Sequence, residues 1–520
     1  MDSRITDSIA YLTFEVPEGR PLIVKAASSF TDQEGAWNNL QAEIPHWDFL
    51  KVRMQLNETW LQHLSKMDVE ERGERREERG EMLLHQFYGA FYRASFLPHE
   101  INDVDGRYPQ FAGKESICSL PIGRDGGGSS YMDFSMWDTY RAVHPLLNII
   151  SPTKSGAMMQ SLVRMYEQGG WLPIFPCWNN YTAAMIGDHC VSVLADAYVK
   201  GIRNFDAEKA YEAMRKNAFE TPASETEYKN GMGRRALKSY LKYGYIPLED
   251  EVKDAFHTNE QVSRTLEYAY DDFCVAQMAK ALGKTEDYQA LMKRSENWRN
   301  VLNPQTGYVD GRYADGRFQN ETSPFEKQKF ITEGAPCHYT WYVPQNPQGL
   351  IEAMGGKESF VSKLDSMFTE GRYWHGNEPC HQVAYMFNYA GEPWRTQKYV
   401  RHILDTEYLD AAGGLSGNDD AGQMSAWLLF SYMGFYPVCP ATPYYMIGSP
   451  VFPRLTLNLE NGKAFTIIAE NASSENIYIQ SATLNGQPYT HNYLLHEDIM
   501  KGGELHFVMG KEPNPAWGRE

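Results

Sequence analysis

The sequence lacks three features that would assign it quickly to a class: paired cysteines, long apolar runs and an excess of positive charge. Its seven cysteines form no Cys-x-x-Cys pair, so neither a zinc knuckle nor a dense disulfide framework is indicated, and an odd number leaves at least one thiol free. No apolar run reaches the roughly 18 residues that a membrane-spanning helix needs. The first 30 residues lack the pattern of a signal peptide. No membrane span and no targeting signal are therefore predicted.

The charge balance excludes polyanionic partners. The formal net charge is −18 at pH 7 and the isoelectric point is about 5.3. Because nucleic-acid binding requires a basic surface that displaces counterions, no nucleic-acid partner is predicted. Neutral sugars or cations suit such a chain better. Its 33 Tyr, 24 Phe and 12 Trp residues could stack on sugar faces, but they suit a large helical core equally well.

The two ends of the chain have the pattern of strands. Residues 9–16 and 21–30 alternate around a Pro/Gly turn at residues 17–19, which predicts a hairpin that could hardly be stable alone. After Pro450, strands are predicted at residues 454–459, 464–469, 477–483 and 504–509, with Asn485-Gly486 as a turn. These patterns predict β segments at both ends of the chain.

Helical patterns dominate the middle. Residues 57–96 read as helix, with a solvated Glu/Arg face at residues 69–81. Thr182 is expected to cap a helix that ends at Gly201, Asp206 to start the next, and Pro393 to open a helix toward Leu404. Apolar residues at helical spacing predict a longer helix over residues 262–276 that ends near Gly283. The fold class is therefore mainly α, and a toroid of paired helices is the preferred architecture.

The long irregular segment at residues 303–339 is a place to search for function, because connections of that length are uncommon in compact domains unless they carry function. The shorter glycine-bearing stretches at residues 123–133 and 373–381 are added to it. Residues 135–141, just after the stretch at 123–133, read Ser-Met-Trp-Asp-Thr-Tyr-Arg. Trp137 could stack on a pyranose while Asp138 accepts its hydroxyl hydrogens. The alternative is a buried tryptophan beside an Asp138–Arg141 pair.

The next two clusters contain carboxylic acids in loops. Residues 331–341 read Ile-Thr-Glu-Gly-Ala-Pro-Cys-His-Tyr-Thr-Trp, where apolar surroundings could raise the pKa of Glu333 as a general acid requires. The alternative is a helix-capping acid. Residues 374–382 read Trp-His-Gly-Asn-Glu-Pro-Cys-His-Gln and offer the amide and carboxylate oxygens that calcium prefers. An ordinary polar loop is the competing interpretation.

A fourth cluster places two acids before a helix. Residues 413–427 read Gly-Gly-Leu-Ser-Gly-Asn-Asp-Asp-Ala-Gly-Gln-Met-Ser-Ala-Trp. An aspartate here is a common helix cap, but Asp419 and Asp420 cannot both cap. One Glu and one Asp on separate loops are the minimum machinery of an inverting glycosidase, in which an acid protonates the leaving oxygen and a base activates water.

These clusters closely resemble those of the family 92 glycoside hydrolases, and the resemblance covers residues 29–518. Five further stretches agree with the family: Asp-Val-Asp-Gly-Arg-Tyr at 103–108, Gly-Gly-Trp-Leu-Pro at 169–173, Met-Ile-Gly-Asp at 185–188, Tyr-Met-Gly-Phe-Tyr-Pro at 432–437 and Ile-Gly-Ser-Pro at 447–450.

The resemblance implies an architecture and an activity. It implies a remnant of an N-terminal β-sandwich domain at residues 1–50, an (α/α)6 toroid at 51–440 and a C-terminal β segment at 441–520. It further implies a calcium-dependent exo-α-mannosidase that releases terminal mannose from glycans with inversion. Calcium (Ca²⁺) would help to bind and distort the mannose. Export to the periplasm or the cell exterior is also implied.

The family's residue roles transfer to matching positions. The resemblance makes Glu333 the general acid and Asp420 the general base, with assistance from Asp419 or Asn418. The remaining residues that it assigns fall into two groups: Trp137, Asp138, Arg141, His375 and Glu378 as substrate contacts, and Asn377, Glu378 and Asp420 as metal ligands.

The chain departs from the family pattern at its start and beside the acid. It begins near the end of the usual β-sandwich domain, and Ala335-Pro336-Cys337-His338 stands where many members have Asn-Ala-Trp-Gln. These positions face the leaving group, so α-1,2 linkage is favoured only as the commonest, with α-1,3 and others open. The alternatives are another helical-toroid carbohydrate enzyme, such as a glucosidase or polysaccharide lyase, and a non-catalytic glycan-binding fragment. The oligomeric state is not predicted.

Overall fold

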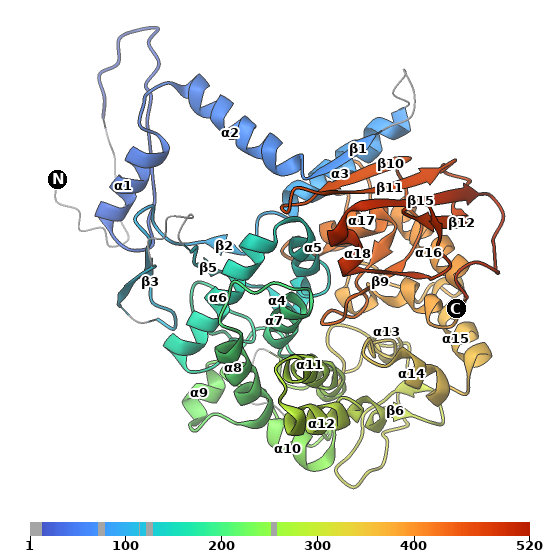
Figure 1. The fold of residues 1–520 in the computed structure, drawn as a ribbon. Coiled ribbons are helices and arrows are strands. Elements are labelled where there is room, and N and C mark those ends of the chain that lie inside the picture. Colours follow the sequence, from blue (N-terminus) through green and yellow to red (C-terminus); the bar gives the residue numbers. More distant parts are fainter. Residues whose placement is uncertain (1–12, 71–77, 114, 121–127, 251–256, 520) are drawn as a thin grey trace.

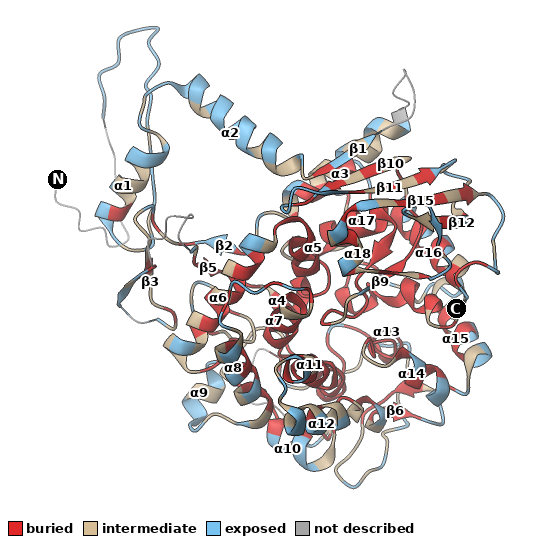
Figure 2. Ribbon diagram, viewed as in Figure 1, coloured by how far each residue is buried: buried red, intermediate tan, exposed pale blue. Residues whose placement is uncertain are grey.

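The computed structural model describes residues 13–70, 78–113, 115–120, 128–250 and 257–519. The protein is mainly helical, as predicted (Figure 1). The helices of the body gather around a buried core, whereas the N-terminal arm stands away from it (Figure 2). The α-helices of the body are α3 (Glu78–Arg93), α4 (Met136–Thr139), α5 (Val143–Ile150), α6 (Pro152–Gly169), α7 (Cys190–Val199), α8 (Ala207–Phe219), α9 (Glu225–Lys229), α10 (Leu237–Tyr243), α11 (Gln261–Ala281), α12 (Thr285–Arg294), α13 (Pro336–Tyr339), α14 (Pro347–Ala353), α15 (Lys357–Thr369), α16 (Pro393–Thr406), α17 (Gln423–Met433) and α18 (His496–Lys501). The 3₁₀ turns are η1 (Asn297–Asn300), η2 (Glu378–Cys380) and η3 (Val383–Asn388).

Most of the predicted helix boundaries are confirmed. Asp206 caps α8 by accepting a hydrogen bond from the Lys209 amide, and Pro393 occupies the first turn of α16. α11 spans the predicted apolar repeat, and nearly all of its residues are buried. The start expected at Thr182 is wrong, because α7 begins only at Cys190. Positive φ angles at Met185 and Gly187 are incompatible with a helix there.

The C-terminal strands form a six-stranded sheet in the order β1-β10-β11-β15-β12-β13. The four predicted strands are confirmed, and β11 and β15 pair in parallel. The helix expected over residues 57–96 is interrupted, because residues 67–70 form β1 at the edge of this sheet; residues 71–77 of the Glu/Arg run lie outside the described residues. The strands of this sheet are β1 (Met67–Glu70), β10 (Arg454–Asn458), β11 (Ala464–Glu470), β12 (Tyr478–Leu484), β13 (Gln487–Pro488) and β15 (Gly503–Gly510).

Short strands between the helices of the body pair into small sheets. A three-stranded sheet has the order β14-β9-β8, and three two-stranded ribbons pair β2 with β5, β3 with β4 and β6 with β7. Their bounds are β2 (His99–Glu100), β3 (Arg107–Pro109), β4 (Ile117–Ser119), β5 (Tyr131–Met132), β6 (Leu302–Asn303), β7 (Tyr308–Val309), β8 (Phe435–Tyr436), β9 (Tyr444–Ile447) and β14 (Tyr493–Leu495).

The N-terminal arm differs from the predicted β segment. The described residues 13–30 contain no strand, although the turn at residues 17–19 is present; the beginning of the first predicted strand lies outside the described residues. The arm instead carries α1 (Gln33–Glu43) and α2 (Phe49–Leu64). An isolated hairpin is marginal because it buries little apolar surface. Asp103 ties the arm to the body by accepting hydrogen bonds from Ser29 and Asn39.

None of the described helices is long and apolar enough to span a membrane.

A buried ionic network lies along α11. The imidazole of His189 donates from Nδ1 to Asp271 at 2.9 Å, and its Nε2 lies 3.4 Å from Glu267. Burial by itself lowers the pKa of His189, but the charge of Asp271, its hydrogen bond and the nearby Glu267 carboxylate outweigh burial and raise this pKa to about 9. His189 is therefore a buried cation held between two acids at neutral pH.

This raised pKa predicts a loss of stability at alkaline pH. The contribution of His189 to the unfolding free energy is fully present below its unfolded pKa of about 6.5, and it declines as the pH rises through about 9. The difference in unfolding free energy between wild type and His189→Gln should shrink by on the order of 3 kcal/mol between pH 6 and pH 9.5. Denaturant titrations at both pH values measure it, with exposed His85→Gln as the control. A difference that does not change with pH would contradict this assignment.

Candidate active site

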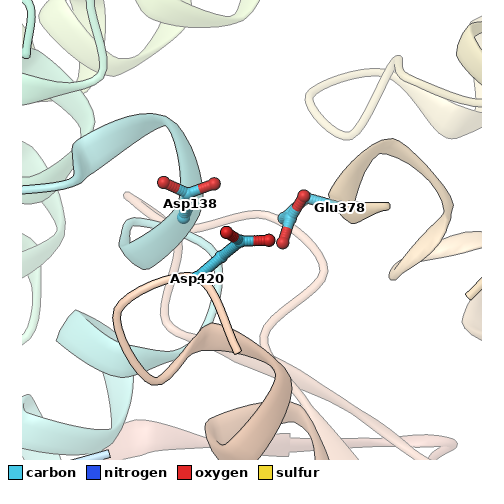
Figure 3. Close-up of side chains that lie close together, drawn as sticks. All are labelled: Asp138, Glu378 and Asp420. Carbon is cyan, nitrogen blue, oxygen red and sulfur yellow. The ribbon is translucent and has the colours of Figure 1, made fainter. Parts of the chain in front are cut away.

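Three carboxylates from distant parts of the chain meet at one point. Asp138 comes from α4, Glu378 from η2 and Asp420 from the loop before α17 (Figure 3). Each offers an oxygen within 4.8 Å of the oxygens of the other two. Like charges at this separation repel strongly in a buried environment, so the cluster requires protons or a cation.

Glu378 is the most deeply buried member of this carboxylate cluster. Its side chain is 1% exposed, and neither carboxylate oxygen has a hydrogen-bond partner among the described residues. Arg141 approaches, but its Nη1 donates to the main-chain carbonyl of Glu378 at 3.4 Å. Burial, followed by the charges of Asp138 and Asp420, raises the pKa of Glu378 well above its usual range. Burial also raises the pKa of Asp138 to about 8, although Ser135 donates a hydrogen bond to it.

The donor set fits a hard cation. Calcium binds carboxylate and amide oxygens, and unpaired buried oxygens such as those of Glu378 are the groups that a bound cation would satisfy. Asn377, which is 7% exposed, adds an amide oxygen next to this cluster in sequence. A zinc site is a poorer match, because no histidine or cysteine joins the three oxygen donors among the described residues.

Glu333 lies in the irregular segment between β7 and α13. The segment is fastened to the start of α11, where the Thr332 amide donates to Ser263 at 2.9 Å. Glu333 itself has a positive φ of 54°, a conformation that costs energy in a non-glycine residue and is concentrated at functional sites. A side chain at Gly334 would approach His338 to 2.9 Å, so a larger residue next to the acid would force the imidazole to move.

The environment of Glu333 suits a proton donor. Its side chain reaches solvent, but partial burial of the carboxyl raises its pKa; the neighbouring His257 opposes this shift and the charge of Asp420 adds to it. The same interaction shows that the charge of Asp420 acts on Glu333. The two predicted acids therefore share one electrostatic environment.

Asp419 and Asp420 have different surroundings. Asp419 accepts hydrogen bonds from the amide and the hydroxyl of Ser425, in the first turn of α17, at 3.0 and 2.7 Å. Asp420 has a φ of 46°, and its side chain points toward Asp138 and Glu378 (Figure 3). The alternative of a helix-associated acid therefore describes Asp419, whereas Asp420 belongs to the carboxylate cluster.

Two glycines allow the loop before Glu378 and the loop before Asp420 to touch. A side chain at Gly417 would lie 2.4 Å from the main-chain oxygen of Gly376, and one at Gly376 would lie 2.8 Å from that of Ser416. Such distances are too short for any Cβ. The glycines thus bring Glu378 and Asp420 together by permitting direct backbone contact.

Comparison with known proteins identifies the family. The sequence profile of the glycosyl hydrolase family 92 catalytic domain matches residues 35–511. The chain belongs to glycosyl hydrolase family 92. The family 92 α-mannosidase BT3965 from Bacteroides thetaiotaomicron is 38% identical, with a TM-score of 0.85 over 95% of this chain and 63% of that chain. The family 92 inverting mannosidase BT2199 from the same species is 34% identical, with a TM-score of 0.85 over 95% and 67%.

A relative from a fungus is named a secreted glycosidase. An uncharacterized secreted glycosidase from Arthroderma benhamiae is 30% identical over 543 residues, which cover 98% of this chain and 63% of the relative. The chain thus spans just under two thirds of the length of this relative and of BT3965.

All five of the predicted sugar-contacting residues in this family 92 chain are buried, and Trp137 and Arg141 contact each other. Trp137 is 2% exposed, and its indole nitrogen donates to Glu267 at 3.0 Å. The guanidinium of Arg141 lies 5.1 Å from the Trp137 ring. The burial of Trp137 matches the alternative interpretation, but the guanidinium of Arg141 donates to the main-chain carbonyls of Trp137 and Glu378 and not to Asp138.

His375 is buried between two tyrosines. Its Nδ1 lies 2.7 Å from the Tyr373 hydroxyl and its Nε2 lies 2.7 Å from the Tyr408 hydroxyl. Tyr408 donates its own proton to the carbonyl of Met424, so it accepts from Nε2, and Tyr373 donates to Nδ1. Burial lowers the pKa of His375 to about 3. With both nitrogens engaged, His375 fixes the start of the loop that leads to Glu378.

Sequence reasoning assigned Asp138 to the sugar alone and did not place it with Glu378 and Asp420. No spacing signal could have done so, because the three residues come from segments that only the tertiary fold unites. Glu267 was also missed. It lies within an apolar helical repeat, where nothing in the sequence distinguishes a buried acid from a solvated one.

Proposed function

We propose that this protein is a calcium-dependent exo-α-mannosidase that inverts configuration, with Glu333 as general acid and Asp420 as general base. The observation that carries the proposal is the meeting of Asp420 with Asp138 and Glu378, within electrostatic reach of a Glu333 whose pKa is raised. An acid and a base on separate loops are the pair of residues that an inverting glycosidase uses. The similarity to BT3965, which is named an α-mannosidase, and to BT2199, which is named an inverting mannosidase, supports mannosides as the substrate class.

The residues divide the reaction between them. Glu333, whose pKa is raised by partial burial, donates its proton to the glycosidic oxygen as the bond to the anomeric carbon breaks. Asp420 accepts a proton from a water molecule, which attacks that carbon from the opposite face. The products are a free hydroxyl on the leaving sugar and β-mannose. Asp419 assists by holding the loop of Asp420 against α17.

Asp138, Glu378 and Asp420, together with Asn377, would hold the calcium ion. When bound, calcium offsets the mutual repulsion of these carboxylates and supplies coordination sites for mannose hydroxyls. Arg141 stabilises the arrangement by fixing the Glu378 main chain.

The finer assignments follow the family resemblance. A complex of BT3965 with mannoimidazole supports a terminal-mannose site, and α-1,2 linkage is favoured, with α-1,3 and others as alternatives. The (α/α)6 toroid and secretion are proposed on the same basis, and the secreted relative supports the latter. Another carbohydrate substrate and a binding-only chain are the competing functions.

Incubation with α-linked mannobioses of each linkage tests this function. We expect β-mannose as the first product. Excess chelator should stop the release of mannose, and added calcium should restore it. Proton NMR of the anomeric positions follows both the release and the configuration of the product. Release of α-mannose would contradict inversion, and release unaffected by chelator would contradict the calcium requirement. Folded protein that releases nothing from any mannobiose would support the binding-only alternative.

A further inference from the structure

Glu267 contacts one side chain on the helix that carries Asp138 and one on the helix that follows the Glu333 loop. It is on α11, and its side chain is fully buried. Its Oε1 accepts two hydrogen bonds at 3.0 Å, one from Trp137 Nε1 and one from the Tyr339 hydroxyl. One buried oxygen therefore joins two side chains that are about 200 residues apart in the sequence.

Both partners adjoin residues to which we have assigned a role. Trp137 precedes Asp138 on α4, and Tyr339 ends α13, which follows the Glu333 loop. Each of these helices has only four residues. A single helical turn has little stability of its own, so its orientation depends on tertiary contacts.

The other oxygen of Glu267 faces His189, which supports α4 a second time. Oε2 lies 3.4 Å from His189 Nε2, and the His189 ring stacks on Tyr140 with the ring centroids 4.1 Å apart. Trp137 and Tyr140, on either side of Asp138, thus both rest on this array. A side chain at Gly187 would come within 2.7 Å of Oε2, so glycine is needed for the close approach.

We infer that Glu267 is a positioning residue that sets the carboxylate of Asp138 relative to the Glu333 loop. This inference rests on the roles proposed above for Asp138 and Glu333. Charge-assisted hydrogen bonds from an indole and a phenol are strong where water is excluded, and they fix both short helices to one rigid helix. A displacement of about 1 Å between reacting groups can reduce the rate about a hundredfold.

Substitutions on α11 separate positioning from general stability. Glu267→Leu removes the acceptor, and we expect kcat on mannobiose to fall about a hundredfold with a much smaller change in KM. Glu267→Gln keeps an acceptor oxygen for Trp137 and Tyr339 and should restore most of kcat. The matched control is Asp272→Asn, which alters another buried acid of α11 that binds Arg234 and Arg294. It should lower the melting temperature but keep the kcat of the folded protein.

A second variant and a structural measurement keep the inference testable. If Glu267→Leu does not fold, Tyr339→Phe removes one of the two donors and should lower kcat in the same direction. Crystal structures of a Glu267 or Tyr339 variant should show Asp138 displaced relative to the Glu333 loop. Unmoved positions with unchanged kcat would overturn the inference. An inactive wild type would refute the proposed function, and the displacement would still decide the role of Glu267.

Discussion

Asp420→Asn is expected to lower kcat by about 10²–10⁴-fold on every α-mannoside, because the amide cannot accept the proton of the attacking water. Glu333→Gln should cause a similar loss on mannobiose, whose sugar leaving group needs a proton, but a much smaller loss on dinitrophenyl α-mannoside, whose leaving group does not. Initial rates of both variants on both substrates measure this contrast. This contrast would assign Asp420 to the activation of water and Glu333 to the protonation of the leaving group.

The matched control is Glu326→Gln, an exposed acid in the same irregular segment as Glu333. It should leave both rates unchanged. Equal losses on the two substrates for Glu333→Gln would show that Glu333 is not the proton donor. An Asp420→Asn variant that keeps more than about a tenth of the wild-type rate would exclude Asp420 as the base.

Glu378→Gln should abolish the stabilisation that calcium provides. At a calcium concentration a hundred times its Kd, the wild-type unfolding free energy should rise by about 2.7 kcal/mol, whereas the variant should show no comparable gain. In excess chelator the wild type should no longer be the more stable protein, and the unfolding free energy of the variant should equal or exceed that of the wild type. The reason is that the substitution removes a buried acid whose oxygens have no donor among the described residues.

Denaturant unfolding with calcium and with chelator gives the four free energies that this comparison needs. Glu326→Gln again serves as the control and should behave like the wild type. A calcium increment that is equal in Glu378→Gln and in the wild type would place the ion elsewhere in the molecule. An increment absent from both proteins would exclude a calcium site in this chain.

The fold was predictable wherever local rules and tertiary packing agree. Asp206 and Pro393 mark helix starts because capping and a fixed proline φ act over one turn. The C-terminal strands were found because their alternation matches one buried face of the sheet. The Thr182 cap failed because positive φ angles downstream prevented a helix, and the N-terminal strands failed because they lack a partner sheet among the described residues.

The sequence by itself determined the family and the segments that contain the candidate catalytic residues. Motifs are contiguous in the sequence, and the type of each residue limits the chemistry that it can perform. Only the tertiary structure decided which acids meet. It united Asp138 with Glu378 and Asp420, assigned Asp419 to Ser425 and buried His375 between tyrosines. These outcomes depend on distances between segments that are far apart in the chain, and side-chain burial and pKa are properties of that packing alone.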